Sequence, residues 1–213
     1  MNYSRMIFFI AVLVYFNSQL YAQTDEWTVK YSKDGKIEVK YNVGNRIDKS
    51  GEEVQLIEYT ATTITDVPYE KCIQAMRDVS LHKEFMGNTE ESEEIETLSE
   101  TEWLAYYFFE PPWPMPDNDC IMKTSLSKND DGKYIVFKGE SSPELIEKKD
   151  VKRLEYYEYE YSFEEKEDNR VEFNIAVRLT PVTSNPEWMV KTWFPKGPVE
   201  FMQDFITVAK ELE

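Results

Sequence analysis

The sequence lacks the histidines and cysteines on which most metal and nucleophilic sites depend. Its 213 residues contain one histidine, His82, and two cysteines. Zinc sites with several histidines are therefore excluded, and a Ser–His–Asp or Cys–His catalytic arrangement would have to use His82. Because His82 stands beside Lys83 in a polar segment, we expect an exposed side chain without a catalytic role.

The two cysteines, Cys72 and Cys120, are also too few for a disulfide-dependent scaffold. They could pair in an oxidising compartment, but we expect two buried thiols. Neither common glycine-rich phosphate-binding pattern occurs. The calcium-like stretch from Ser127 to Gly132 is followed by Lys138 where such a loop needs a glutamate. We therefore predict no cofactor, no metal and no catalytic motif.

Basic residues are scarce, since 24 Lys and Arg stand against 41 Asp and Glu and give a formal net charge of −17. Such a surface repels phosphate backbones, which excludes nucleic acid as a partner. Glutamates concentrate in residues 90–96, where we expect a solvated strand edge or loop rather than an acidic docking patch. We expect a monomer.

Only one long apolar run is present, and it lies at the N-terminus. Arg5 precedes the run Ile7–Phe16, and the small residue Ala22 follows it, which is typical of a signal peptide cleaved near Ala22. The run is shorter than the roughly 18 residues that indicate a membrane-spanning helix, so we predict no stable membrane insertion. Residues 1–22 are expected to direct export to the periplasm or the medium, and residues 23–213 to form one ligand-binding domain.

The remaining chain alternates between strand and helix patterns. A helix is expected over Tyr69–Arg77, with Asp66 as its cap and Pro68 at its start, and a shorter one over Leu81–Met86. Strands are expected over the other periodic or β-branched segments, which are Trp27–Tyr31, Ile37–Val43, Val54–Ile64, Ile95–Leu98, Trp103–Phe109, Cys120–Leu126, Tyr134–Gly139, Tyr157–Phe163 and Val171–Leu179.

The clearest pattern lies in the last two of these strands. Tyr157, Tyr159 and Tyr161 alternate with glutamates and a serine, and Val171–Leu179 shows the same period of two after a turn at residues 166–169. Strict alternation predicts an antiparallel pair with one buried and one solvated face. Because three tyrosine hydroxyls on a buried face need partners, the pattern favours a cavity with water or ligand over a solid core, although tyrosines that reach solvent at a rim are the alternative.

After a break at residues 195–198, apolar residues recur at three- and four-residue steps from Phe201 to Leu212. This period predicts an amphipathic helix with an unusually aromatic face. It is the only helix of this length available to cover a sheet of many strands. A twisted sheet with one buried face curls around what covers it, and curling around one helix leaves space at the ends.

Four passages resemble the START (StAR-related lipid-transfer) family of the helix-grip superfamily. Trp27 with Lys33–Ile37 is similar to its opening strand, and residues 66–69 resemble the entry to its first helix. Tyr106-Tyr107 followed by Pro112–Asp119 resembles its "Y…PWPxxxRD" signature. Residues 185–190 with 196–198 resemble the start of its C-terminal helix.

The resemblance implies an α+β helix-grip fold, in which a curved antiparallel β-sheet wraps around a long C-terminal α-helix and two short helices follow the third strand. It implies an apolar ligand held inside that grip, and a structural role for Asp119. The family's arginine before this aspartate is Asn118 here, so the usual Arg–Asp contact cannot form in the same way. We expect Arg153 and Arg178 to pair with surface glutamates.

The predicted ligand-binding residues are the inward side chains of these strands and of the terminal helix, together with two possible gates. Trp113 with Met115 and Trp188 with Met189 are the gate candidates, because Trp and Met suit an adaptable apolar opening. The full set is Trp103, Tyr107, Phe109, Trp113, Met115, Tyr157, Tyr159, Tyr161, Phe173, Ile175, Val177, Trp188, Met189, Phe201, Met202 and Phe205.

The pattern and the resemblance together favour binding, and possible transfer, of a hydrophobic small molecule such as a lipid or sterol-like compound. An enzyme of the same superfamily, of the cyclase or hydratase type, is the alternative and needs an acid or base inside the cavity. A protein-interaction module with a filled core is the third possibility.

Overall fold

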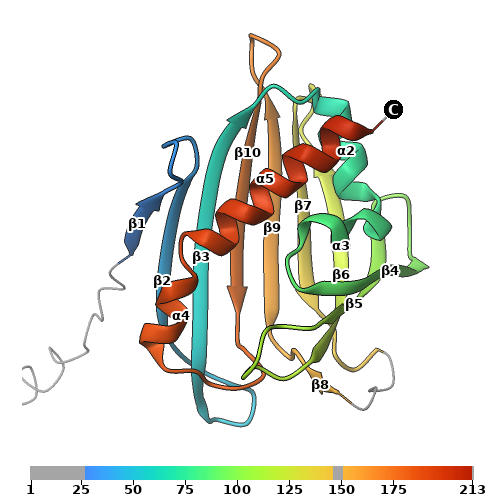
Figure 1. The fold of residues 1–213 in the computed structure, drawn as a ribbon. Coiled ribbons are helices and arrows are strands. Elements are labelled where there is room, and N and C mark those ends of the chain that lie inside the picture. Colours follow the sequence, from blue (N-terminus) through green and yellow to red (C-terminus); the bar gives the residue numbers. More distant parts are fainter. Residues whose placement is uncertain (1–26, 146–150, 213) are drawn as a thin grey trace, which may run out of the picture.

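The computed structural model describes residues 27–145 and 151–212, which form one large curved sheet with its helices on the concave side (Figure 1). The predicted signal peptide, including Ala22, lies outside the described residues. Within them, no helix is both long and apolar enough to span a membrane. The α+β class, the curved antiparallel sheet and the long C-terminal helix of the prediction are confirmed.

The sheet has ten strands in the order β1-β2-β3-β10-β9-β7-β6-β5-β4, with all neighbours antiparallel and the short β8 added in parallel to β6. The strands are β1 Thr28–Tyr31, β2 Glu38–Ile47, β3 Glu53–Thr65, β4 Thr89–Thr97, β5 Glu102–Phe109, β6 Asn118–Lys128, β7 Tyr134–Ser141, β8 Lys152–Arg153, β9 Tyr157–Glu165 and β10 Val171–Leu179.

The predicted β9–β10 pair is present, with Tyr161 opposite Ile175 in the register. The tyrosines of β9 and the inward residues of β10 from Val171 to Val177 are buried, and Leu179 is half-buried. The alternate positions are half-buried or exposed, apart from the buried Ser162. The acidic run of residues 90–96 lies in β4 at the edge of the sheet, as expected. Alternation therefore identified both the pairing and the buried face.

The helices are α2 Tyr69–Arg77, the 3₁₀ helix η1 Val79–Leu81, α3 His82–Phe85, α4 Glu187–Trp193 and α5 Lys196–Glu211. Helix α5 runs obliquely across the concave face of the sheet, and α2 and α3 lie beside its C-terminal half (Figure 1). Asp66 does not cap α2, because Pro68 occupies the N-cap position, where no side-chain bond is made. The Asp66 carboxylate instead pairs with Lys210 of α5 at 2.7 Å. That ion pair ties the end of α5 to the sheet.

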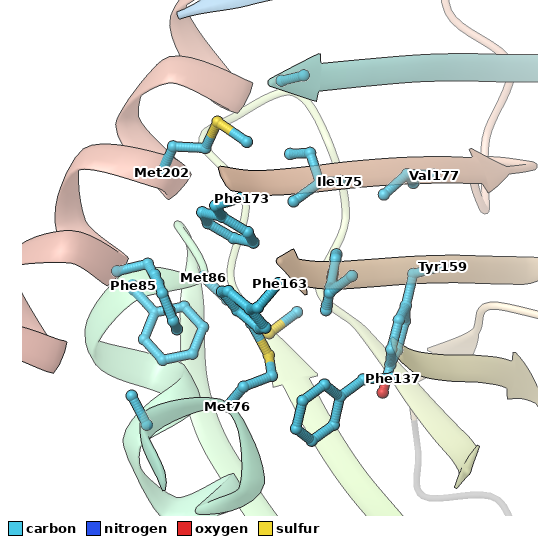
Figure 2. Close-up of a cluster of buried hydrophobic side chains, with 14 of the residues drawn as sticks. Met76, Phe85, Met86, Phe137, Tyr159, Phe163, Phe173, Ile175, Val177 and Met202 are labelled. Atoms are coloured by element: carbon cyan, nitrogen blue, oxygen red, sulfur yellow. The ribbon is translucent and has the colours of Figure 1, made fainter. Parts of the chain in front are cut away.

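A solid aromatic cluster fills the space between the sheet and the middle of α5. The Phe163 and Phe173 rings stack at 4.6 Å, and Phe205 of α5 lies 4.7 Å from Phe173 and 5.4 Å from Phe163. Figure 2 shows Phe163 and Phe173 facing Met202 of the helix. All four side chains are fully buried. We call the part of the interior around them the packed end.

Both cysteines are free and buried, as predicted. The inward prediction for β5 is confirmed for Trp103 and Tyr107, but Leu104 and Tyr106 on the opposite face are buried as well. Beside the first residues of β6, Leu154 donates its backbone N–H to the Asp119 carbonyl and Ser142 donates its own to the Ile121 carbonyl. Strand β8 has only two residues and was not predicted.

Candidate functional site

An open cleft lies between the sheet and the N-terminal half of α5, at the other end of the interior from the packed end. Its volume is about 350 Å³, within the range of small-molecule sites. Three walls enclose it, formed by the concave face of β3, β9 and β10, the proline-rich loop between β5 and β6, and the segment from Pro181 to Phe201. Its apolar and aromatic lining residues are Tyr59, Met86, Phe109, Pro111, Met115, Pro116, Leu154, Tyr157, Tyr161, Leu179, Pro181, Val182, Trp193 and Phe201.

Three buried tyrosines form the sheet wall of the cleft. Tyr59 of β3 and Tyr157 and Tyr161 of β9 point to the concave side at alternating positions. Burial raises the pKa of Tyr157 to about 12 and that of Tyr59 and Tyr161 well above 10. All three hydroxyls therefore stay protonated near neutral pH and can both donate and accept hydrogen bonds.

The third tyrosine of the β9 row, Tyr159, does not line the cleft. Its ring lies over Gly139 of β7, where an added Cβ would come within 2.3 Å of the ring carbons. Its hydroxyl is hydrogen-bonded to Thr124 at 2.7 Å. Tyr159 therefore satisfies its polar group inside the protein, and only two of the three predicted hydroxyls reach the cleft.

The helix wall depends on how α4 joins α5. The indole of Trp193 lies against Gly197, where an added Cβ would come within 1.8 Å of the ring. The next residue, Phe194, is buried and stacks on Tyr41 of β2 at 4.1 Å. The stacked Phe194 fixes the chain to the sheet, and Trp193 is thereby positioned at the cleft.

The loop wall is held by a buried ion pair. Arg153 of β8 bonds Asp119 through Nε at 2.9 Å and Nη2 at 2.6 Å, and both side chains are at most 1% exposed. The prediction that Arg153 pairs with a surface glutamate is wrong, whereas Arg178 does pair with Glu58 at 2.8 Å on the surface. Although Asn118 stands where the resembled family has arginine, Asp119 obtains a guanidinium from β8 instead.

Two acids stand at the rim of the cleft on α5. Glu200 and Asp204 are one helical turn apart and both line the opening. Partial burial, with the neighbouring Glu200 as the smaller cause, raises the pKa of Asp204 above its usual value. Lys196 lies 3.6 Å from Glu200. No lysine or arginine lines the cleft within the described residues, so its charge is acidic.

The structure separates the sixteen predicted residues into three groups. The five in the cleft are Phe109, Met115, Tyr157, Tyr161 and Phe201. The eight that are buried elsewhere in the interior are Trp103, Tyr107, Tyr159, Phe173, Ile175, Val177, Met202 and Phe205. The gate candidates Trp113 and Trp188 do not line the cleft and are 92% and 67% exposed, and Met189 also lies outside it.

Sequence reasoning missed several cleft residues. Tyr59 alternates with Glu58 and Thr60 in a predicted strand, so its inward orientation could have been found from the same pattern that identified the β9 tyrosines. Leu179 continues the alternation of the predicted strand Val171–Leu179, so the same pattern could have found it as well. Val182 and Trp193 carry no such signal, because they lie outside the periodic segments.

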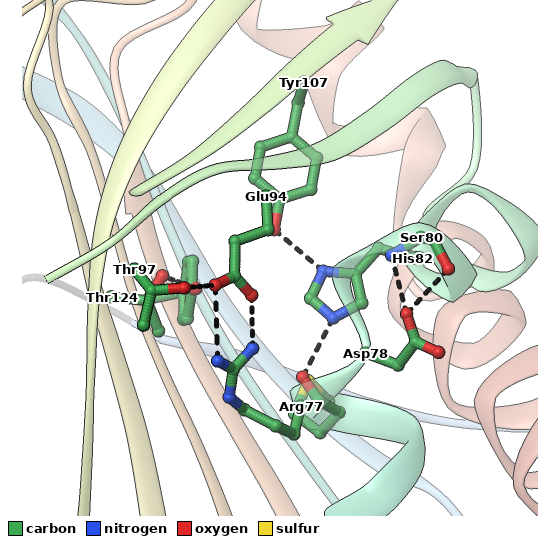
Figure 3. Close-up of polar contacts among 10 residues, drawn as sticks. Arg77, Asp78, Ser80, His82, Glu94, Thr97, Tyr107 and Thr124 are labelled. Atoms are coloured by element: carbon green, nitrogen blue, oxygen red, sulfur yellow. Dashed lines mark hydrogen bonds and ion pairs between the residues drawn. The ribbon is translucent and has the colours of Figure 1, made fainter. Parts of the chain in front are cut away.

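His82 is buried, which corrects the expectation of an exposed residue. Only 3% of it is exposed, and both ring nitrogens are engaged, Nε2 donating to the Met76 carbonyl at 2.9 Å and Nδ1 accepting from the Tyr107 hydroxyl at 2.8 Å (Figure 3). Burial lowers the pKa of His82 to about 4. A neutral imidazole with both nitrogens occupied is a structural group, and it offers no free base to the cleft.

The described part of the chain contains no group of three or more potential metal ligands. Asp119, at the start of β6, is committed to Arg153. The cleft is thus an aromatic, hydroxyl-bearing site with an acidic rim.

No protein-family model and no curated protein matches this chain by sequence. Solved structures do match it by shape. The STAR-related lipid transfer protein of Xanthomonas axonopodis is similar over 88% of this chain and 100% of its own, with TM-score 0.71 and 18% identity. Human StAR-related lipid transfer protein 5 is similar over 98% of this chain and 96% of its own, with TM-score 0.67 and 14% identity.

A third structure is the Zhui aromatase/cyclase of Streptomyces, similar over 73% of this chain and 94% of its own at TM-score 0.52 and 9% identity. It superposes less well than the two lipid transfer proteins. The chain has the START-like helix-grip fold, as the resemblance implied.

Proposed function

We propose that this protein binds a hydrophobic small molecule reversibly in the cleft and can carry it between sites. The observation that carries the proposal is the cleft itself, an open aromatic space beside the buried core. Removing apolar ligand surface from water supplies the driving force. The tyrosine hydroxyls of Tyr59, Tyr157 and Tyr161 supply orienting hydrogen bonds inside it.

The names of two structural neighbours support the proposal, because both are described as lipid transfer proteins and match nearly their whole length. The N-terminal pattern supports a proposal for the cellular location of this activity. If residues 1–22 are a signal peptide, the monomeric carrier acts outside the cytoplasm, in the periplasm or the medium.

The experiment is a calorimetric titration of the protein with 1-decanol, a neutral single-chain probe. We expect one molecule to bind per chain. Val182→Trp places a large side chain on the cleft wall and is expected to weaken binding at least about tenfold, which is about 1.4 kcal/mol. Val29→Trp is the matched control, because Val29 is an exposed residue of β1 outside the cleft. Absence of decanol binding to the unmodified protein would refute the proposal.

An enzyme acting on an apolar substrate is the second candidate function. The raised pKa of Asp204 at the rim favours it, since an acid of raised pKa can transfer protons. Against it, the deeper walls carry only tyrosine as a titratable group, and His82 is occupied elsewhere. Recovery of a chemically unchanged ligand after prolonged incubation would support the carrier, and conversion that Asp204→Asn abolishes would support the enzyme.

A further inference from the structure

We infer that the cleft selects amphiphiles with a positively charged head group, which lies between the carboxylates of Glu200 and Asp204 and the aromatic walls. The inference rests on the proposed function and names its ligand class. Three independent features of the cleft carry it.

The first feature is the sign of the charge around the opening. The charged residues that line the cleft are Glu200 and Asp204, and both are acidic. They stand one turn apart on α5, so both carboxylates can approach one head group at the mouth. Lys196, 3.6 Å from Glu200, is an exposed i,i+4 partner that screens this acid only weakly. The rim therefore attracts a cation and repels a carboxylate or phosphate.

The second feature is the density of aromatic faces next to these acids. Tyr161 and Phe201 lie with ring centroids 5.4 Å apart at the inner side of the rim, and Trp193 covers the start of α5. The face of an aromatic ring attracts an ammonium group by its quadrupole, and this attraction grows as the cation loses water. A neutral or anionic head group gains nothing comparable from these faces.

The third feature is an unused acceptor on the sheet wall of the cleft. Tyr59 is 9% exposed, and no hydrogen bond joins its hydroxyl to any residue that the structure describes. Because Tyr59 lines the cleft, a ligand or a water molecule in the cleft can satisfy this hydroxyl. Because the hydroxyl remains protonated, its oxygen accepts from an ammonium N–H while its proton stays available to a second polar atom.

The basic residues of this region lie elsewhere. Arg46, Lys49 and Lys152 line a separate groove on the other side of the segment at Pro181 and Val182, which borders both spaces. That groove also contains Asp48 and Glu155, so its charge is mixed, whereas the charged residues that line the cleft are both acidic.

The test compares three ten-carbon probes below their micelle-forming concentrations at pH 7, namely decylammonium, 1-decanol and decanoate. The ammonium is protonated at this pH, as a lysine side chain is. Calorimetry is expected to give the order decylammonium, then decanol, then decanoate. Because the acids are at the solvent-exposed rim, the preference for decylammonium over decanol should be about fivefold and should shrink with added salt.

The double variant Glu200→Gln/Asp204→Asn assigns the preference to these acids. It is expected to lose most of the preference for decylammonium over decanol, so that the two probes bind with similar affinity. Glu211→Gln is the matched control, since Glu211 is exposed on the same helix and does not line the cleft. It should behave as the unmodified protein does.

The outcomes separate the inference from the proposed function. If decanol binds but decylammonium binds no more tightly, or if decanoate binds best, the charge inference is overturned and the carrier function stands. If none of the three probes binds, both fail. If the double variant keeps the full ammonium preference, the acids are not its source and the inference is overturned.

Discussion

The packed end and the cleft end of the interior share one sheet and one helix but are stabilised in different ways. At the packed end, Phe163, Phe173 and Phe205 fill the space between the sheet and α5 completely. At the cleft end, two specific contacts hold the walls in place although the space between the walls is open. These are the buried Arg153–Asp119 pair and the stacking of Phe194 on Tyr41.

This difference shows how a small domain can keep an open site without losing its fold. Apolar burial at one end supplies stability, and specific polar and stacking contacts at the other hold loops whose own packing is sparse. Helix α5 belongs to both ends, since Phe205 and Phe201 lie one turn apart on it. Substitution of Phe205 should therefore mainly affect stability, and substitution of Phe201, one turn away, should mainly affect binding.

The largest expected effect is at the packed end. Phe205→Ala should lower the free energy of unfolding by about 3–5 kcal/mol, because the ring is fully buried and leaves a cavity. Phe201→Ala should cost only about 1–2 kcal/mol, because its ring is half-exposed at the cleft. Urea denaturation measures both. Equal costs for the two substitutions would show that the ends are not different.

The same pair should show the opposite order in ligand binding. Phe201→Ala is expected to weaken decanol binding about tenfold, whereas Phe205→Ala should leave the affinity of the folded protein unchanged. Calorimetry in conditions where both variants are folded gives the comparison. A larger binding loss for Phe205→Ala would place the ligand at the packed end.

Loss of the ion pair at the cleft end should lower the free energy of unfolding about as much as loss of a ring at the packed end. Arg153→Met leaves the Asp119 carboxylate buried without its partner and should cost about 3–5 kcal/mol. Lys152→Met, at the exposed neighbouring position, is the control and should cost less than about 0.5 kcal/mol. Urea denaturation at neutral pH tests this, and a cost below about 1 kcal/mol for Arg153→Met would contradict it.

Acid should destabilise the protein through His82, the first residue of α3, whose ring bonds Met76 of α2 and Tyr107 of β5. Its pKa is about 4 in the folded protein, against about 6.5 in an unfolded chain. The unfolded chain therefore binds more protons between these values, and stability falls as the pH drops from about 6.5 to about 4, by up to about 3 kcal/mol.

The double variant His82→Phe/Tyr107→Phe removes this titration together with the hydrogen bond between the two residues. The difference in unfolding free energy between the protein and this variant should depend on pH in that window. Because most carboxylates titrate near its acid end in both proteins, they cancel in the difference. A pH-independent difference would show that His82 is already charged or exposed.

The smallest effect is expected at the gate candidate Trp113. Trp113→Ala should change stability by less than about 0.5 kcal/mol and leave decanol binding unaltered, because the side chain is exposed and outside the cleft. Trp193→Ala is the matched substitution inside the cleft and should weaken binding severalfold. If Trp113→Ala weakened decanol binding as much as Trp193→Ala does, the result would support Trp113 as a gate.

Much of the fold could be predicted because local periodicity determines it. The alternation of Tyr157–Phe163 and Val171–Leu179 and the three- and four-residue steps from Phe201 are strong patterns, and all three elements formed as expected. The same patterns could not separate cleft from core. Tyr159 and Tyr161 have equal periodicity, but only the neighbouring Gly139 shows that Tyr159 turns into the interior.

The errors concern residues whose environment depends on distant chain segments. His82 lies in a polar stretch, yet the carbonyl of Met76 and the hydroxyl of Tyr107 satisfy its ring when α3 packs on β5. Arg153 is buried because Asp119, which lies 34 positions before it, compensates its charge. A polar residue with a specific buried partner does not follow the average burial of its type.

The most direct test of the cleft as the binding site uses the methionine methyl groups as reporters. Met86 and Met115 line the cleft, whereas Met76, Met122 and Met202 are fully buried outside it. Methyl-labelled protein is titrated with 1-decanol and followed by NMR. We predict that the Met86 and Met115 signals shift with the binding curve while the other three stay in place. Decanol binding that leaves Met86 and Met115 unmoved would contradict the assignment of this cleft as the ligand site.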